Sequence, residues 1–260
     1  MISNALVLAR RFLARTLSRP QTLIGIALTP VALTLLFAAV LGDTVSLPGG
    51  IDYHDYLVPG MFAMTVASAA TGTAVAVNSD MTNGIIDRFR SLPMSGAGVL
   101  VGQSLAALLT TAVAAALLAV TGTAIGWRVH AGAPHVAAAF GLILLFAYAL
   151  NWGMSCLGML FRSAEGLQQF GLLLTFGSTL LSSAFVPTAN MPSALKTVAH
   201  WNPLNVLTVA VRNQLGAPHP ADAAPAWPMQ HPEAATMICS LAMLAVFAPL
   251  AVRLYRTRRH

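Results

Sequence analysis

Six long apolar stretches, separated by short polar segments, dominate the chain of 260 residues. Each one approaches or exceeds the roughly 20 residues that an α-helix needs to cross a bilayer. We therefore expect an all-α polytopic membrane protein that forms a single transmembrane domain over residues 1–260. The six predicted transmembrane helices are Thr22–Leu41, Tyr56–Val77, Gly98–Gly126, Val136–Leu160, Leu167–Phe185 and Ala234–Val252.

The segment before the first span, residues 1–20, has a different pattern. Its apolar residues recur at helical spacing, while arginines lie on the opposite face. This pattern predicts an amphipathic helix that lies in the membrane interface. A charged flank that only anchors the first span is the alternative. The apolar face comprises Ile2, Ala5, Leu6, Ala9, Phe12, Leu13 and Leu17, and the opposite face carries Arg11, Arg15 and Arg19.

Basic residues are distributed unevenly between the two predicted sides of the membrane. Eleven of the 14 lysines and arginines fall in the N-terminal segment, the loop after the second span, Arg162 and the C-terminal segment. The opposite side has only Arg128, Lys196 and Arg212. Because basic residues are enriched in cytoplasmic loops, both termini are predicted to be cytoplasmic. An even number of spans gives the same result.

Composition excludes an ordinary soluble protein. The chain is 57% hydrophobic and 8% charged, with a mean hydropathy of +0.72, whereas soluble domains carry about 25% charged residues. The net charge of +6 is concentrated beside the apolar spans, so we expect membrane lipids and no nucleic acid as partners. Arginine supplies 13 of the 14 basic residues, which is typical of GC-rich bacteria and favours the bacterial inner (plasma) membrane.

The spans contain essentially no ionisable side chains, and this argues against two classes of membrane protein. Ion-coupled carriers usually need charged groups near the membrane midplane, and membrane enzymes need catalytic side chains that converge. We expect no catalytic residue and no metal site, because the histidines lack helical H-x-x-x-H spacing. The sequence also lacks the G-x-x-x-x-G-K-[ST] phosphate loop. If ATP drives transport, another polypeptide must hydrolyse it.

The loop after the second span, residues 79–93, predicts a short cytoplasmic helix. Ser79 or Asp80 can cap its start, and Pro93 ends it. A short helix with one apolar edge and several charges is suited to docking into a cleft on a soluble partner. A helix that rests on lipid headgroups is the alternative. The apolar edge comprises Ile85, Ile86, Phe89 and Leu92, and the charges are Asp87, Arg88 and Arg90.

The predicted outer loop before the last span, residues 186–233, mixes prolines with apolar residues. Its run Pro203–Val211 is apolar but too short to cross a bilayer. We therefore expect short re-entrant helices that dip into the outer leaflet. Trp201 is expected at the level of the lipid headgroups, where tryptophan is enriched.

Small and hydroxyl-bearing residues within the spans are candidates for an uncharged substrate path. Close helix packing is the alternative that such residues favour more strongly. Asn151 is the best exception, because a buried amide in lipid needs a partner. A path without charge favours amphiphilic or hydrophobic cargo. The candidates are Thr65, Ser68, Gly72, Asn78, Asn151, Thr175, Ser178, Thr179 and Ser182.

Two segments carry a family resemblance. The run Asn83–Ser95 (NGIIDRFRSLPMS) resembles the Gly-Thr-x-Glu-Arg-x-x-x-x-Pro-x-Ser segment of ABC-2-type exporter permeases, a group that includes the daunorubicin-resistance type of drug and lipid exporter. Trp201-Asn202-Pro203-Leu204, with Val211-Arg212-Asn213 following, is similar to the Asn-Pro-Leu motif in the family's last outer loop. The chain departs from the family at Ile85, where Thr is common, and at Asp87, where Glu is common.

The resemblance implies the permease subunit of an ATP-driven exporter, which carries an amphiphilic or hydrophobic substrate such as a drug, lipid or glycoconjugate out of the cytoplasm. Two such subunits, identical or paralogous, pair. Each binds a cytoplasmic ATPase that holds ATP and Mg²⁺, so this chain binds no cofactor and is not itself an enzyme. The implied coupling helix comprises Gly84, Ile85, Ile86, Asp87, Arg88, Phe89, Arg90, Leu92 and Pro93, and the outer-loop motif comprises Trp201, Asn202 and Pro203.

Other functions stay open at this point. A carrier or channel would transport without an ATPase, and a membrane-embedded enzyme would need a constellation that the sequence does not offer. An assembly or immunity protein would use the same fold only to bind its partners.

Overall fold

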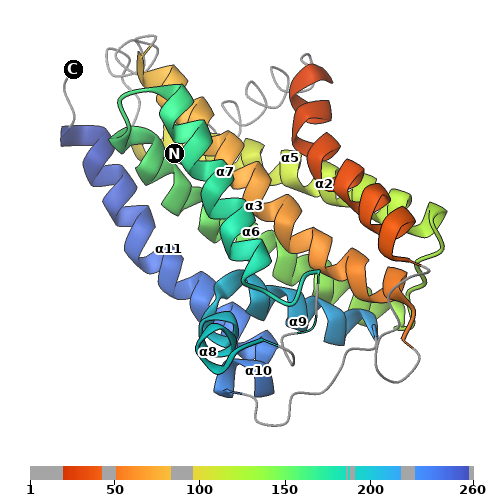
Figure 1. Cartoon of the computed structure of the whole chain (residues 1–260). Coiled ribbons are helices and arrows are strands. Elements are labelled where there is room, and N and C mark those ends of the chain that lie inside the picture. Colours follow the sequence, from red (N-terminus) through yellow and green to blue (C-terminus); the bar gives the residue numbers. More distant parts are fainter. Residues whose placement is uncertain are drawn as a thin grey trace.

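The computed structural model of the chain describes residues 20–42, 51–82, 96–185, 187, 191–217 and 226–257. Nine α-helices make up the regular structure of these residues (Figure 1). They are α2 (Pro20–Leu41), α3 (Tyr53–Thr82), α5 (Gly96–Ala124), α6 (Ala133–Leu160), α7 (Ala164–Leu180), α8 (Ser193–Trp201), α9 (Pro203–Leu215), α10 (Trp227–Gln230) and α11 (Pro232–Thr257).

The predicted all-α polytopic membrane protein is confirmed at this level. Helices occupy all six predicted span positions, as α2, α3, α5, α6, α7 and α11. Four of them, α3, α5, α6 and α11, are long and apolar enough to cross a membrane. Six crossings stay a prediction, because α7 has 17 residues and the described apolar part of α2, Leu28–Leu41, is short.

Most helix boundaries differ from those predicted by a few residues, and two of the differences bear on the candidate sites. Ser79 and Asp80, expected to cap a separate helix, lie inside α3, which continues to Thr82. In this last turn, the Thr82 hydroxyl donates to the Asn78 carbonyl at 3.1 Å. The second difference is at the C-terminal end of the fifth predicted span. That span is expected to run to Phe185, but α7 ends at Leu180. The predicted N-terminal helix at residues 1–20 and the implied coupling residues 84–93 lie outside the described residues, except for Pro20.

Helix α3 is the central element of the bundle. It packs against α2, α5, α6, α7 and α9, and most of its apolar stretch is buried. Alanines and threonines recur along it, and such small side chains allow neighbouring helices to approach closely in a membrane. Near its first turns, the Phe62 ring packs edge-on against Trp127 and Phe140, with centroids 6.1 and 5.7 Å away.

The helix ends gather at two opposite ends of the bundle (Figure 1). The first, called the α9 end below, contains α9 with residues 51–56, 125–132 and 181–185. The backbone N–H of His130 donates to the Leu215 carbonyl at 3.2 Å and ties two of these segments together. The second, called the Thr82 end, contains Thr82, the α6–α7 turn around Arg162 and the last residues of α11.

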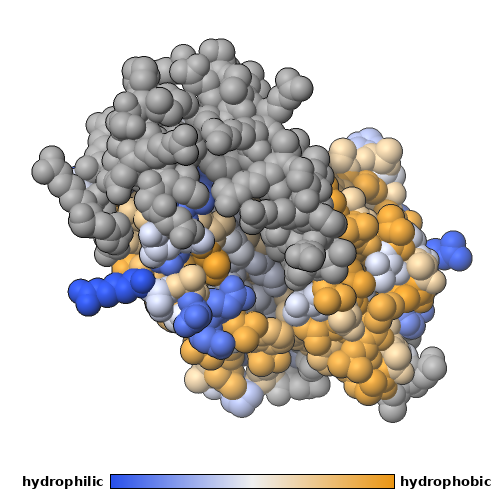
Figure 2. Space-filling view, turned by 90° about the horizontal axis from the view of Figure 1, so that it is seen from above, coloured by the Kyte–Doolittle hydropathy of each residue, from blue (hydrophilic) through white to orange (hydrophobic). Residues whose placement is uncertain are grey.

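Apolar side chains cover much of the sides between these two ends. On α5, Leu109, Val113, Leu117 and Val120 are exposed and recur every three or four residues, so they form one stripe along the helix. Seen from above Figure 1, the coloured surface at the right of the view is mostly apolar, whereas hydrophilic residues gather at its left (Figure 2). An apolar surface that runs along whole helices is what lipid contact requires.

Candidate functional site

The C-terminal end of α7 is held by the densest group of buried polar contacts at the α9 end. After Leu180 the chain turns through residues 181–185 instead of continuing as a helix. The last carbonyls of an α-helix lack partners within the helix, so side chains from elsewhere must satisfy them. Here those side chains come from α3 and α9. We call Tyr53, Tyr56, Asn202, Asn205 and Arg212 the α7 clamp.

Asn202, from the predicted outer-loop motif, connects two helix ends. Its side-chain oxygen accepts from the Leu204 N–H at 3.0 Å, so Asn202 is the N-cap of α9. Its amide nitrogen donates to the carbonyls of Ser178 at 2.6 Å and Leu181 at 3.1 Å. Pro203 follows at the first helical position, where proline needs no N–H partner. One Asn-Pro pair thus starts α9 and closes α7.

Asn205 holds the next part of the turn. Its side-chain oxygen accepts from the Ser183 N–H at 2.8 Å and from the Ser183 hydroxyl at 2.6 Å. Its amide nitrogen donates to the Ala199 carbonyl at 2.9 Å. Asn205 is fully buried, so these contacts replace the water that its amide would otherwise bind.

Arg212 carries a charge into the centre of the clamp, with only 1% of the residue exposed. Its guanidinium donates to the Tyr56 carbonyl at 2.9 and 3.2 Å. It also donates to the Ser183 hydroxyl at 2.9 Å, the Ser183 carbonyl at 2.7 Å and the Ala184 carbonyl at 3.4 Å. Every one of these acceptors is a neutral oxygen. The guanidinium lies over the Tyr56 ring, 3.8 Å from its centroid, where a cation is attracted to the ring face.

Two tyrosines from the first turn of α3 complete the α7 clamp. The Tyr56 hydroxyl donates to the Ser183 carbonyl at 2.7 Å, and the Tyr53 hydroxyl donates to the Phe185 carbonyl at 3.4 Å. The start of α3, the end of α7 and the length of α9 are therefore joined by buried polar contacts. An arrangement of this kind fixes the relative position of three helices at one end of the bundle.

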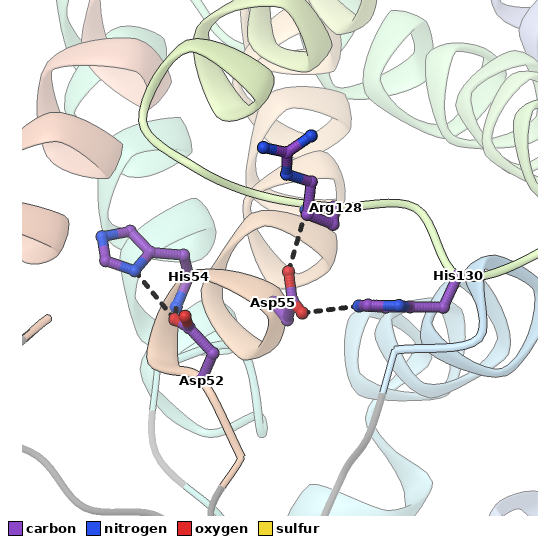
Figure 3. Close-up of polar contacts among 5 residues, drawn as sticks. All are labelled: Asp52, His54, Asp55, Arg128 and His130. Atoms are coloured by element: carbon purple, nitrogen blue, oxygen red, sulfur yellow. Dashed lines mark hydrogen bonds and ion pairs between the residues drawn. The ribbon is translucent and has the colours of Figure 1, made fainter.

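A second polar group at the α9 end surrounds Asp55 (Figure 3). The residue is 8% exposed, and its carboxylate accepts from the Arg128 N–H at 3.0 Å and contacts His130 Nε2 at 2.7 Å. These contacts hold the α5–α6 loop against the start of α3. The close-up shows Asp52 and His54 as a separate pair, with Nδ1 and the carboxylate 2.8 Å apart.

The pKa of the Asp52 carboxyl lies below its usual value of 3.8. Partial burial raises the pKa of its carboxyl, but hydrogen bonds from the backbone and side chain of His54 lower that pKa by more. Among the described residues, no group of three or more His, Cys, Asp or Glu is placed to hold a metal ion.

Small residues bring α7 close to α3 along the rest of its length. The α7 residues that are buried, Leu167, Gly171, Thr175 and Thr179, recur every four positions and form one narrow stripe. The hydroxyls of Thr71 and Thr175 lie 3.3 Å apart across this contact. The other faces of α7 are largely exposed, including Phe170 and Leu173.

The predicted substrate-path residues lie in several environments. Thr65, Thr175, Thr179 and Ser182 are buried. Thr65, Thr179 and Ser182 donate to carbonyls of their own helix or turn. The Thr175 hydroxyl pairs with that of Thr71 across the α3–α7 contact. Ser68, Gly72 and Ser178 are partly exposed. Their role in a substrate path stays a prediction.

Asn151 has the buried partner that the sequence required. Its side-chain oxygen accepts from the Thr73 hydroxyl at 3.0 Å, which joins α6 to α3 in the middle of the bundle. Its amide nitrogen is buried without a hydrogen-bond partner among the described residues. Buried polar atoms of this kind are uncommon in folded proteins.

At the Thr82 end, Asn78 fixes α3 against the end of α6. Its amide nitrogen donates to the carbonyls of Gly158 at 3.0 Å and Phe161 at 2.7 Å. Phe161 is the C-cap of α6, directly after its last residue Leu160. In the sequence, the implied coupling residues begin two positions after the end of α3 at Thr82 and six positions after Asn78.

The sequence singles out Asn202 as part of a motif, but it does not predict the contacts of the α7 clamp. Arg212 was counted as a residue of an outer loop, whereas it is buried. A lone arginine that ends the apolar run Pro203–Val211 was the available signal, because an arginine beside buried residues needs oxygen partners. Nothing in the local sequence indicated that Tyr53, Tyr56 and Ser183 would supply them.

Comparison with known proteins agrees with this architecture. Residues 4–215 match the ABC-2 type transporter family. The chain is 27% identical over 240 residues, 92% of its own length and 81% of the relative's, to the daunorubicin resistance ABC transporter permease protein DrrB1 of Streptomyces coeruleorubidus. With its four apolar helices of membrane-spanning length, the chain is a multi-pass membrane protein of the ABC-2 type transporter family.

Proposed function

We propose that the chain is the permease subunit of an ABC exporter and that a separate cytoplasmic ATPase subunit drives it. Family membership over residues 4–215 is the observation that carries this proposal. The bundle supports it, because its spanning helices are apolar. Their Asp, Glu and Arg residues lie near the helix ends and not near the membrane midplane, where ion-coupled carriers use charged groups. ATP and Mg²⁺ bind the partner ATPase, and this chain contributes the path through the membrane.

In this proposal the α9 end faces the outside and both termini are cytoplasmic. The distribution of basic residues along the sequence supports that orientation. The bundle separates the two groups of basic residues as the proposal requires. Exposed Arg162 lies at the Thr82 end, whereas Arg128 lies at the α9 end. The membrane is the bacterial inner membrane, and all six long helices cross it.

The proposed cargo is an amphiphilic or hydrophobic molecule of the drug or lipid type. The relative from Streptomyces coeruleorubidus is named for daunorubicin resistance, and daunorubicin is a suitable probe. The partly exposed Ser68, Gly72 and Ser178 are the candidate path residues that a substrate reaches most readily, and they carry no charge.

Transmission from the ATPase is proposed to run through α3. The implied coupling helix, residues 84–93, follows Thr82 directly, and Asn78 binds α3 to the end of α6. Because α3 also contributes Tyr53 and Tyr56 to the α7 clamp, one helix connects the ATPase side with the α9 end. A second permease subunit, identical or paralogous, covers part of the exposed apolar flank.

Co-purification in mild detergent with an ABC ATPase subunit from the same organism, co-expressed with this chain, tests the proposal. The wild type is compared with a variant that combines Arg88→Glu and Phe89→Ala. A matched control carries Arg128→Glu, a charge reversal at an exposed position of the α9 end. We expect the wild type and the control to retain the ATPase and the double variant to lose it. If no ATPase associates with the wild type, the exporter proposal fails; if the double variant still binds and couples, only the assigned coupling residues are wrong.

A further inference from the structure

Helix α7 is attached to the bundle in two different ways. Along the length of the helix, the narrow stripe of Leu167, Gly171, Thr175 and Thr179 packs against the bundle. At the α9 end, the α7 clamp supplies hydrogen bonds and one buried charge. Helices that touch through a narrow stripe can tilt against each other with little loss of contact. The position of α7 at the α9 end therefore depends mainly on the clamp.

The contacts of the clamp are short-range and directional. Asn202 and Arg212 donate to the end of α7 and the turn after it, and Asn205 accepts from that turn, at distances between 2.6 and 3.4 Å. Hydrogen bonds weaken steeply beyond these distances and at poor angles. A displacement of residues 181–185 by a few ångströms therefore breaks the set together, and the end of α7 is either held or released.

Because Arg212 is charged and buried, the release of α7 depends on the entry of water at the α9 end. A guanidinium keeps its charge in proteins, and in this structure it has neutral oxygens as acceptors. If residues 181–185 move away, Arg212 loses the Ser183 hydroxyl and the carbonyls of Ser183 and Ala184 and keeps only the Tyr56 carbonyl. A buried charge without acceptors is costly. Release of α7 and entry of water at the α9 end must therefore occur together.

We propose that Arg212 is a positioning residue that latches the end of α7 between α3 and α9, and that this latch opens when the exporter releases substrate. The proposal rests on the proposed function, in which the α9 end faces the outside. The held state, with Arg212 buried against Ser183 and Tyr56, closes the α9 end. Movement of α3, driven from the ATPase side, is the event that displaces the Tyr53 and Tyr56 contacts and opens the latch.

A cross-linking experiment in the intact permease–ATPase complex tests whether the latch moves. Phe37 on α2 and Phe185 beside the clamp have ring centroids 4.7 Å apart, so Phe37→Cys and Phe185→Cys place two thiols across the latch. Cys156→Ala and Cys239→Ala remove the native thiols. A short bismaleimide is added without nucleotide and after trapping with ATP and vanadate. We expect the cross-linked fraction to fall by about fivefold or more on trapping, the lower end of coupling between two sites. An equal yield in both states overturns the latch.

Variants of Arg212 test whether this residue sets the position. Arg212→Lys keeps the charge but loses the planar fork that reaches several carbonyls at once. Without nucleotide, we expect the cross-linked fraction of the Arg212→Lys variant to fall toward that of the trapped wild type. We also expect the ATPase activity of its complex to respond less to daunorubicin. Arg128→Lys, at an exposed position of the same end, is the matched control and should behave as wild type. A purely structural Arg212 would lower yield and thermal stability without changing the ratio between the two states.

The outcomes separate the latch from the proposed function. If Arg212→Lys does not fold, the comparison of trapped and untrapped complexes with intact Arg212 still decides whether the latch opens. If the ATPase never associates with the chain, the exporter proposal and the latch fail together. If the ATPase associates and hydrolyses ATP while the cross-linked fraction stays constant, the latch alone is wrong.

Discussion

Gly171 of α7 faces Thr71 of α3 so closely that a methyl group on Gly171 would overlap the Thr71 side chain. The Thr71 hydroxyl bonds the Ala67 carbonyl at 3.1 Å and lies 3.3 Å from the Thr175 hydroxyl, so several contacts must shift before Thr71 can yield. The absence of a side chain at Gly171 therefore sets the distance between the two helices.

Replacing Gly171 with alanine is expected to destabilise the protein. Overpacking in a well-packed contact costs about 1–3 kcal/mol, whereas glycine to alanine in an open helix position gains up to about 1 kcal/mol. Gly177 on the same helix has no atom within 4 Å of an added methyl group, so Gly177→Ala is the matched control. Thermal unfolding in detergent should show a lower midpoint for Gly171→Ala and an unchanged or higher midpoint for Gly177→Ala. Equal midpoints would mean that α7 does not pack on α3 at this position.

Asn202 can be dissected because its two functions use different atoms. Asn202→Ser keeps an oxygen that can cap α9 and removes the amide that donates to the Ser178 and Leu181 carbonyls. Asn202→Ala removes both. A lost helix cap costs about 1 kcal/mol, and an unmade hydrogen bond to a buried group costs about 1–3 kcal/mol. We expect both variants to be less stable than wild type, with alanine the worse. If serine restores full stability, the contact with α7 contributes nothing.

Asp55 and Asp52 offer a paired test of the α9 end. Asp55 is buried and holds the α5–α6 loop through Arg128 and His130, whereas 61% of the Asp52 side chain is exposed. Asp55→Asn should lower stability by about 1–3 kcal/mol and speed trypsin cleavage after Arg128. Asp52→Asn should leave that cleavage unchanged at pH 7. Trypsin added to intact spheroplasts also reports on topology, because cleavage there requires the α9 end to face outward.

The lowered pKa of Asp52 predicts how the stability difference between wild type and Asp52→Asn changes with pH. A group whose folded pKa is depressed contributes stability above its unfolded pKa and loses it as the pH falls through the folded pKa. The contribution of Asp52 is therefore present above the ordinary value of 3.8 and disappears below it. Because the side chain is exposed, solvent screens the effect and keeps it small. The unfolding midpoints of wild type and Asp52→Asn should converge as the pH falls below 3.8; a difference that widens there would contradict the assignment.

The sequence predicted the long helices better than it predicted the contacts at their ends. Apolar length decides where a helix can cross a membrane, so the six predicted positions agree with α2, α3, α5, α6, α7 and α11. The end of α7 was misplaced because Leu181–Phe185 is still apolar or small, and only the side chains of α9 and α3 stop the helix there. Those residues are between about 20 and 130 positions away in sequence, beyond the reach of local patterns.

The candidate site was predicted only in part for the same reason. Asn202 and Pro203 stand in a recognisable motif, and Asn151 was correctly expected to need a buried partner. The sequence did not identify Arg212, because its acceptors are backbone carbonyls and a hydroxyl of residues 56, 183 and 184, which no residue pattern specifies. Backbone acceptors become visible only when the fold brings the segments together.

Asn78 provides the last prediction, on transmission from the ATPase side. Its amide donates to the Gly158 and Phe161 carbonyls, so Asn78→Asp would place a carboxylate against two carbonyl oxygens, whereas Asn78→Ala only removes the donors. Thr82→Ala is the control, because the Thr82 hydroxyl bonds carbonyls of its own helix alone. If α3 transmits movement, both Asn78 variants should retain the ATPase but lose daunorubicin-stimulated hydrolysis, with aspartate the more severe because a desolvated charge adds to the lost bonds. Full stimulation in Asn78→Asp, at normal protein yield, would show that the coupling between ATPase and permease does not pass through the α3–α6 contact.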